Sequence, residues 1–348
     1  MDVVEHALGA TGRGAPRAFD RRARSPGVVM LPANVRAALD ALLDGVSRND
    51  LAQRAMAISE RYRAGGASKA VIHDRMDALA YAVVRMPATY AAVGEALERT
   101  ALHAPGLAPT SILDLGAGPG TATFAAREVW PSITHATEIE TNAAFRALAG
   151  ELRAVGLPYV AVETRAGDAA TMSVPPKSAD IVVASYLLVE LSENQAQKLV
   201  LSALESCRDA LVLVEPGTSA GFARLRAARS ALIASGARVI APCPGEMACP
   251  MSGTDWCHFS VRLARSRDHK LVKGADVPFE DERFAYLVVT RTLDVQPTAA
   301  RVLTEPAVER GDVTLKVCTP SGLAVERVPR RDKTGYKQAR KLAWGDNR

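Results

Sequence analysis

The chain has 348 residues, 48% of them hydrophobic, and a net charge of +5, which suits two domains or one large domain with additions. No apolar run approaches the roughly 18 residues of a transmembrane helix, so we expect no membrane association. Five cysteines in a chain without an apolar secretory segment predict a reducing compartment, not a disulfide framework.

The first hundred residues divide into two predicted parts. Residues 1–30 are rich in Gly, Ala and Arg and show no hydrophobic period, which predicts a disordered basic N-terminus. Residues 31–104 show helical periods and are expected to form a helical N-terminal module. Within it we predict one helix over 68–85, a break at Pro87, and a second helix over 90–102.

Residues 105–238 alternate between short apolar runs and amphipathic segments. This alternation predicts a parallel, doubly wound α/β sheet with a Rossmann-like arrangement. The predicted strands are 111–115, 133–139, 159–164, 180–184 and 210–215.

A glycine-rich loop follows the first predicted strand. It reads Asp114-x-Gly116-x-Gly118-x-Gly120 and opens a helix, so its backbone can approach a ligand closely. An acid before the loop would repel a pyrophosphate, but it can bind the ammonium end of S-adenosylmethionine.

Two further acids follow the next two strands. Glu138 is placed to accept the ribose hydroxyls, and Asp168 to contact the adenine amino group. Acids at three successive strand ends resemble the class I S-adenosylmethionine-dependent methyltransferase pattern, although such a fold can also be retained without cofactor. The catalytic residue is not evident, because the Asn/Asp-Pro-Pro-Tyr/Phe motif of nucleic-acid amino-methylases is absent after the fourth strand.

Three of the five cysteines lie in a segment whose sequence predicts neither a helix nor a strand. Cys243, Cys249 and Cys257 are separated by five and then seven residues, and Cys318 follows in a strand-like run. Four cysteines can close a tetrahedral zinc site or hold an iron–sulfur cluster, and the long irregular spacing suits a cluster better. The alternative is a set of unconnected, packed thiols. The fifth cysteine, Cys207, is expected in a helix of the core.

The remainder of the chain is divided into a cysteine-rich and basic segment (239–275), a small β module (276–328) and a basic C-terminal tail (329–348). Basic residues of the first and last parts predict an RNA-phosphate surface, with a solvated charged surface as the alternative. They are Arg262, Arg265, Arg267, Lys270, Lys273, Arg330, Arg331, Lys333, Lys337, Arg340 and Lys341.

Several motifs resemble one known family. They are Arg85-Met-Pro-Ala-Thr-Tyr90, Asp114-Leu-Gly-Ala-Gly-Pro-Gly120, Asp255-Trp-Cys-His-Phe-Ser260, Lys273-Gly274, Pro278-Phe-Glu-Asp-Glu-Arg-Phe-Ala-Tyr286 and Val317-Cys-Thr-Pro320. Together they resemble the methyltransferase-like proteins associated with the small ribosomal subunit of mitochondria and their bacterial relatives, over residues 31–348.

The resemblance implies a [4Fe-4S] cluster on Cys243, Cys249, Cys257 and Cys318, and binding to small-subunit ribosomal RNA during assembly. It implies a bacterial cytoplasmic protein, or one of the mitochondrial matrix in a eukaryote, which we expect to be monomeric away from the ribosome. Whether methyl transfer occurs is left open. The alternatives are an active rRNA methyltransferase with a structural cluster and a zinc-stabilised methyltransferase with a non-RNA substrate.

Overall fold

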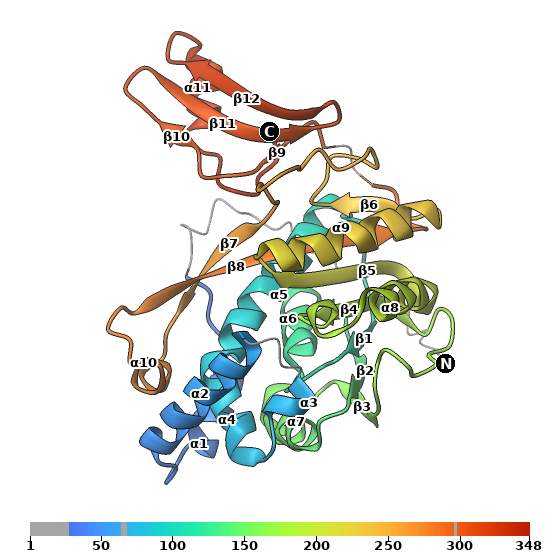
Figure 1. Ribbon diagram of the computed structural model, residues 1–348, viewed down its shortest axis with the longest axis vertical. Coiled ribbons are helices and arrows are strands. Elements are labelled where there is room, and N and C mark those ends of the chain that lie inside the picture. Colours follow the sequence, from blue (N-terminus) through green and yellow to red (C-terminus); the bar gives the residue numbers. More distant parts are fainter. Residues whose placement is uncertain (1–27, 64–67, 296–297) are drawn as a thin grey trace, which may run out of the picture.

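A computed structural model describes residues 28–63, 68–295 and 298–348 (Figure 1). Most of the predicted disordered N-terminus, residues 1–27, lies outside these ranges. The last residues of this segment, 28–30, lie beside β7 (Phe259–Ala264). Val29 exchanges backbone hydrogen bonds of 2.8 and 2.9 Å with Arg262 and Ala264 of that strand. None of the described helices is long and apolar enough to cross a membrane.

An eight-stranded sheet forms the centre of the molecule. Its order is β3-β2-β1-β4-β5-β8-β6, and β7 pairs with β8 outside this path. The first five strands are parallel, whereas β8 runs antiparallel to β5, β6 and β7. The class I methyltransferase fold expected from the sequence is thereby confirmed. The strands are β1 (Ser111–Leu115), β2 (His135–Glu140), β3 (Ala161–Ala166), β4 (Ala179–Ser185), β5 (Cys207–Pro216), β6 (Arg238–Ala241) and β8 (Phe279–Thr290).

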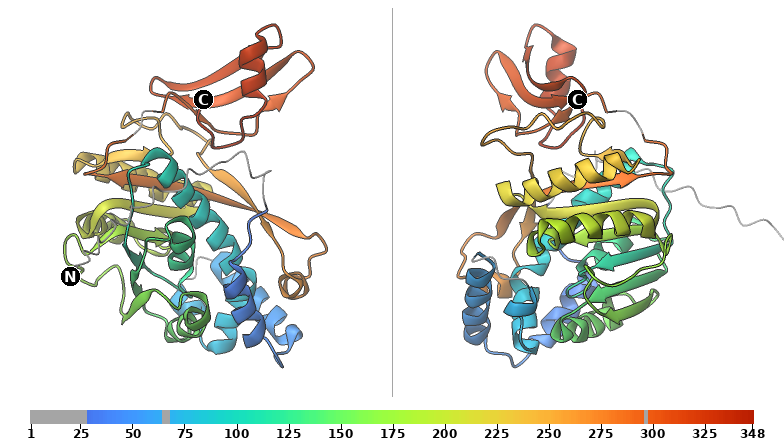
Figure 2. Two further views of the ribbon diagram at one scale, coloured as in Figure 1. Left: turned by 180° about the vertical axis from the view of Figure 1, so that it is seen from behind. Right: turned by 45° about the vertical axis from the view of Figure 1, so that its right-hand side comes forward.

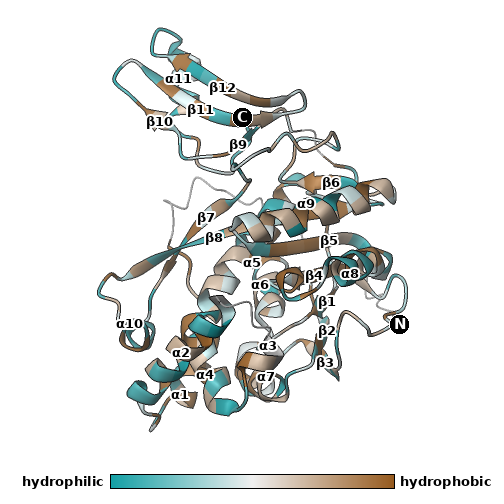
Figure 3. Cartoon of the chain, in the orientation of Figure 1, coloured by the Kyte–Doolittle hydropathy of each residue, from teal (hydrophilic) through white to brown (hydrophobic). Residues whose placement is uncertain are grey.

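Helices cover both faces of this sheet (Figure 2). Alternate residues of β1 belong to different cores: Ile112 packs with the helices of one face, and Leu113 with those of the other. Strands buried on both faces read as continuous apolar runs, and Figure 3 shows β5, in the middle of the sheet, as a mainly brown, hydrophobic ribbon. One face carries α5 (Met86–His103), α6 (Thr121–Val129) and α7 (Ala143–Gly156), and the other carries α8 (Glu193–Ser206) and α9 (Ser219–Ala234).

The N-terminal module contains more helices than predicted. The segment expected as one helix over 68–85 is two helices, because Asp74 accepts a 2.9 Å hydrogen bond from the Asp77 amide and caps a new helix start. Pro87 does not separate two helices but lies in the first turn of α5, where no backbone donor is needed. The module comprises α1 (Ala33–Leu42), α2 (Arg48–Arg63), α3 (Ser68–Val71), α4 (Arg75–Val84) and α5 (Met86–His103).

The C-terminal part differs from the predicted boundaries. Strand β8, expected in a separate β module, is a member of the main sheet, and the predicted cysteine-rich segment contains β6, β7 and α10 (Arg267–Lys273). The expected basic tail is folded, since α11 (Lys333–Ala339) packs its Ala339 into the core of a small four-stranded sheet. The strands of that sheet are β9 (Arg301–Val302), β10 (Ala307–Val308), β11 (Asp312–Thr319) and β12 (Gly322–Pro329).

Candidate functional site

The glycine loop joins β1 to α6 and is bonded to the end of β2. The amides of Gly116 and Ala117 donate to the Ile139 carbonyl at 2.9 and 3.1 Å. The amide of Gly118 donates to the Glu140 carboxylate at 2.8 Å. These bonds hold the loop against the carboxyl end of the neighbouring strand, where ligands bind in open α/β sheets.

The three glycines of the loop have positive φ angles of 71°, 55° and 82°. A Cβ atom at Gly120 would lie 2.9 Å from a Glu138 carboxylate oxygen, and one at Gly116 would lie 3.2 Å from Leu187 Cδ1. At Gly118 nothing lies within 4 Å of such an atom. The loop is therefore closely packed at its two ends and open at its middle glycine.

Two of the predicted acids are buried beneath the loop. Asp114 is 1% exposed and neither of its carboxylate oxygens has a hydrogen-bonding side chain or backbone partner among the described residues. Burial, and then the charges of Glu138 and Glu140, raise the pKa of Asp114 well above its ordinary value. Glu138 is also 1% exposed and forms an ion pair with Arg153. Its pKa is raised by burial, against the opposing charge of Arg153.

Glu140 contacts the loop directly, although the sequence analysis selected Glu138. Both acids lie on the same side of β2, but Glu140 is its last residue and bonds to the amides of Gly118 and Asn142. Its position at the strand end is the signal that could have identified it. Asp168 lies beyond β3, is exposed, and accepts a 2.9 Å hydrogen bond from the Ala170 amide.

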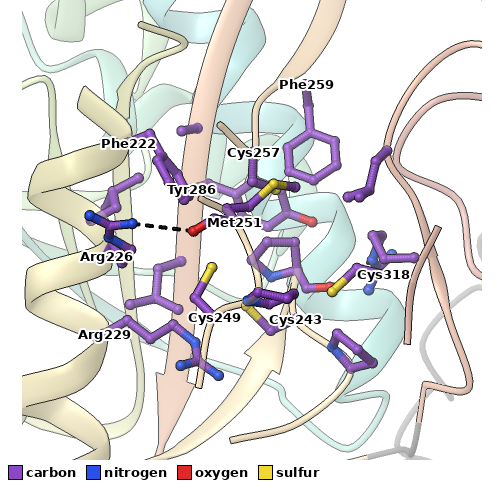
Figure 4. Close-up of a pocket in the computed structure, with 18 of the residues that line it drawn as sticks. Phe222, Arg226, Arg229, Cys243, Cys249, Met251, Cys257, Phe259, Tyr286 and Cys318 are labelled. Atoms are coloured by element: carbon purple, nitrogen blue, oxygen red, sulfur yellow. Dashed lines mark hydrogen bonds between the residues drawn. The ribbon is translucent and has the colours of Figure 1, made fainter. Parts of the chain in front are cut away.

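The four predicted cysteine ligands line one cavity of about 50 Å³ (Figure 4). Cys243, Cys249 and Cys257 come from the segment between β6 and β7, and Cys318 comes from β11 of the small sheet. Cys207 does not line this cavity. It is the first residue of β5, not part of the helix expected for it, and its thiol donates to the Leu204 carbonyl at 3.2 Å.

Burial raises the pKa of three of the cavity thiols. It raises the pKa of Cys243 and, together with repulsion from neighbouring cysteines, that of Cys257 and Cys318, the last to about 11. Thiols in this state are protonated at neutral pH, so binding of a metal would have to release their protons. Among the described residues, no group of three His, Cys, Asp or Glu side chains is arranged to hold a single metal ion.

Two buried arginines also line the cysteine cavity. Arg229 of α9 is 6% exposed and donates to the carbonyls of Gly245 and Met247, both at 2.8 Å. Arg301 of β9 is 1% exposed and donates to the carbonyl of Pro242 at 2.8 Å. Within the described ranges, neither guanidinium forms an ion pair with a carboxylate. Buried cations require compensating negative charge, and the cysteines are the groups beside them that can supply it.

The predicted basic residues fall into two different environments. Three of those in 262–273 are neutralised: Arg262 pairs with Asp281 at 2.7 Å, and Arg265 and Lys273 pair with Glu280 at 3.0 and 2.6 Å. Arg267 and Lys270 have no ion-pair partner among the described residues. The structure therefore separates two groups that the sequence had treated alike.

The C-terminal basic residues are exposed on α11 and beside it. None of the six has an ion-pair partner in the part of the chain that the structure describes. We call them the α11 cations: Arg330, Arg331, Lys333, Lys337, Arg340 and Lys341.

Comparison with known proteins identifies relatives. A family model described as mitochondrial small ribosomal subunit Rsm22 matches residues 75–348. The human mitochondrial ribosome assembly protein METTL17 is 28% identical over 289 residues, covering 77% of this chain and 61% of that protein. A mitochondrial Rsm22-cox11 tandem protein of Schizosaccharomyces pombe is 25% identical over 286 residues, covering 68% of this chain and 38% of that protein. The chain thus spans less than two thirds of the length of these relatives.

Solved structures match parts of the chain at low sequence identity. Magnesium protoporphyrin IX methyltransferase from Synechocystis matches with a TM-score of 0.38 and 12% identity, covering 67% of this chain and 90% of that one. An S-adenosylmethionine-dependent methyltransferase from Leishmania major matches with a TM-score of 0.39 and 13% identity, covering 62% and 82%.

Proposed function

The chain belongs to the Rsm22 family, and we propose that it is an assembly factor of the small ribosomal subunit that binds ribosomal RNA, S-adenosylmethionine and a [4Fe-4S] cluster. The family match covers 274 of the 348 residues, from 75 to 348, and includes the glycine loop, the cysteine cavity and the α11 cations. The human relative is named a ribosome assembly protein, which supports the cellular part of this proposal.

The cysteine cavity carries the cofactor part of the proposal. Four thiols line one cavity together with two buried arginines that lack carboxylate partners among the described residues. Four thiolates around a cluster would provide the negative charge that these cations require. The four cysteines are widely and irregularly spaced in the sequence, and they lack the short Cys-x-x-Cys knuckle that is common in structural zinc sites. The donor set therefore fits a cluster better than zinc.

The glycine loop supports binding of S-adenosylmethionine. Asp114 holds two unpartnered carboxylate oxygens beneath the loop, and Glu140 ends the adjacent strand. In our proposal Glu138 contacts the ribose, because its ion pair with Arg153 leaves one carboxylate oxygen without a partner among the described residues, and Glu140 holds the loop through the Gly118 amide. The cofactor would supply a methyl group to a bound substrate.

The α11 cations support RNA binding. Exposed arginines and lysines without acidic partners retain their full charge for phosphate contacts, whereas the paired Arg262, Arg265 and Lys273 would first have to break an ion pair. We therefore assign the RNA-phosphate surface mainly to the C-terminal sheet. In a eukaryote the protein would act in the mitochondrial matrix, as its relatives' names suggest, and in a bacterium it would act in the cytoplasm.

Anaerobic purification tests the proposal directly. We expect about four iron and four sulfide per chain, an absorption band in the visible region, and copurified small-subunit rRNA. Zinc without sulfide would show that the cysteines hold a zinc ion and no cluster. Incorporation of labelled methyl groups into rRNA would identify an active rRNA methyltransferase. Absence of the protein from small-subunit precursors in cell extracts would contradict the assembly role.

A further inference from the structure

A tyrosine of the main sheet lines the cysteine cavity. Tyr286 lies in β8, pairs with Val214 of β5, and is one of the side chains around the four thiols in Figure 4. It is 4% exposed, and its hydroxyl group has no hydrogen-bond partner among the described residues. Tyrosine hydroxyl groups that are buried in proteins usually have such a partner. The missing acceptor is therefore expected among the groups that bind in the cavity.

The ring of this tyrosine is held in place by other aromatic rings. Its centroid lies 5.2 Å from that of Phe259, in an edge-on contact, and 5.8 Å from that of Phe284. Phe259 follows Cys257 by two residues, so the tyrosine ring packs against the segment that carries one of the thiols. The packing of these rings therefore sets the position of the hydroxyl group before a ligand binds.

Two hydrogen-bond donors in the cavity have no acceptor. Burial raises the pKa of Tyr286, against the charges of Arg301 and Arg99, so the hydroxyl group keeps its proton and can donate it to a hydrogen bond. The second donor is Nε of Arg229, which is buried and unpartnered within the described ranges, although Nη2 of the same side chain donates to two carbonyl groups. Unused donors from both β8 and α9 favour an anionic acceptor in the space between the cavity walls.

We infer that the Tyr286 hydroxyl group donates a hydrogen bond to a sulfur of the proposed [4Fe-4S] cluster, either an inorganic sulfide or a cysteine thiolate. Hydrogen bonds to the sulfurs are among the factors that set the reduction potential of an iron–sulfur cluster. Such a bond is stronger when the acceptor is more negative, so it stabilises the reduced cluster and raises the potential. Tyr286 is thus a positioning residue and not a ligand. The inference rests on the proposed function, since it assigns a residue that acts on the proposed cluster.

Tyr286→Phe tests this role, because it removes the hydroxyl group and keeps the ring. The full-length protein, purified without oxygen, would be titrated with dithionite, which gives one electron to the cluster, while the EPR signal of the reduced cluster is followed. We expect the variant to lower the equilibrium constant for reduction about tenfold, which is about 59 mV for a one-electron couple. Tyr159→Phe makes the same change at a side chain that is 83% exposed, and it should leave the potential unchanged.

A second measurement reports on the hydrogen bond itself. The hydroxyl proton exchanges with solvent, so the ENDOR spectrum of the reduced wild type in deuterated water should contain a deuterium coupling that Tyr286→Phe lacks. If the variant does not assemble the cluster, the wild-type spectrum decides: a strong exchangeable coupling supports the bond, and the absence of any such coupling contradicts it.

Iron and sulfide contents of the same samples separate this inference from the proposed function. Zinc without sulfide in the wild type would contradict both. A wild type and a Tyr286→Phe variant that hold the same iron and sulfide, with one potential and one ENDOR spectrum, would contradict the inference alone and leave the cluster standing. Thermal unfolding confirms that both variants are folded.

Discussion

Arg301 donates a 2.8 Å hydrogen bond from Nε to the carbonyl oxygen of Pro242, and so joins the small C-terminal sheet to the residue before Cys243. Its other two nitrogens reach the Gly345 carbonyl at 2.8 Å and His103 Nε2 at 3.0 Å. One buried side chain therefore contacts the cysteine segment, the C-terminal end and α5. The cysteine cavity and the docking of the C-terminal sheet share this residue.

Replacing Arg301 should loosen the C-terminal sheet. Arg301→Gln removes several buried hydrogen bonds and a buried charge, and we expect a loss of about 3 kcal/mol in the free energy of unfolding. Arg301→Lys keeps the charge but cannot make the same set of hydrogen bonds. Its free energy of unfolding should therefore lie between those of Arg301→Gln and the wild type. Limited digestion with thermolysin should cleave residues 300–348 first. A wild-type digestion pattern in Arg301→Gln would contradict this role.

The five single Cys→Ser variants test the ligand assignment. Cys243→Ser, Cys249→Ser, Cys257→Ser and Cys318→Ser should each lose iron, sulfide and colour in samples prepared without oxygen. Because Cys318 lies on β11 and the others lie between β6 and β7, loss of the cluster should also expose the connecting segment 242–258 and the small sheet, residues 301–329, to proteolysis. The main sheet should remain folded.

Cys207→Ser is the control for that series. Its thiol is buried at the start of β5 and lies outside the cavity, so iron and sulfide content should match the wild type. Burial raises the pKa of Cys207 to about 12, which is unfavourable for a ligand thiolate. Loss of the cluster in Cys207→Ser with retention in Cys318→Ser would overturn the assignment.

Local patterns in the sequence were sufficient for much of the fold. The parallel strands were predictable because each is buried on both faces and reads as an apolar run, as Ile112 and Leu113 illustrate. The glycine loop was predictable because positive φ angles require glycine at each of its three positions. The grouping of the four cysteines was predictable from their spacing and from the family resemblance, and the structure places all four on one cavity.

Features that depend on distant partners were not predictable. Nothing local to 279–290 indicates that β8 inserts antiparallel between β5 and β6. Arg229 and Arg301 read as ordinary surface arginines, and only the fold buries them beside the cysteines. The ion pairs of Arg262 and Arg265 likewise depend on the pairing of β7 with β8.

The α11 cations should dominate the salt dependence of RNA binding. Changing all six to Gln should weaken binding to small-subunit rRNA and reduce the slope of log affinity against log salt by up to about four. Changing Arg262, Arg265 and Lys273 to Gln should have a much smaller effect, because acids already neutralise them. Filter binding between about 50 and 200 mM salt measures both slopes. Equal effects of the two sets would refute the assignment of the surface to α11.

The glycine loop should respond differently at its middle and its end. Gly120→Ala would place a Cβ atom 2.9 Å from a buried Glu138 oxygen and should abolish S-adenosylmethionine binding. Gly118→Ala meets no atom within 4 Å and incurs only the backbone cost of its positive φ, about 1 kcal/mol. Gly118→Arg should nevertheless abolish binding, because its long side chain would occupy the open side of the loop. Calorimetry with S-adenosylmethionine compares the three, and no heat with the wild type would remove cofactor binding altogether.

Glu215 should make the stability of the main sheet dependent on pH. The residue is fully buried at the end of β5, where its carboxylate accepts hydrogen bonds from the amides of Leu188 and Val189 at 2.7 and 3.3 Å. Burial nevertheless raises the pKa of Glu215 to about 8, from 4.5 for a free glutamate. Between these two values the folded state holds a proton that the unfolded state has lost. The stability that Glu215 contributes is therefore fully present below about pH 4.5. From there to about pH 8, the free energy of unfolding falls by about 1.4 kcal/mol per pH unit.

Glu215→Gln isolates this contribution, because the amide has the same shape and does not titrate. The free energy of unfolding of the variant should carry no contribution from this position that depends on pH, because the amide neither gains nor loses a proton. Urea unfolding should therefore find that the wild type loses stability relative to the variant as the pH rises from about 5 to about 8. The reason is that only the wild type must then bury a charge or hold a proton against its solution equilibrium. If the difference in free energy of unfolding between the two proteins stays constant from about pH 5 to about pH 8, Glu215 has the same pKa in the folded and unfolded chains and the prediction is wrong.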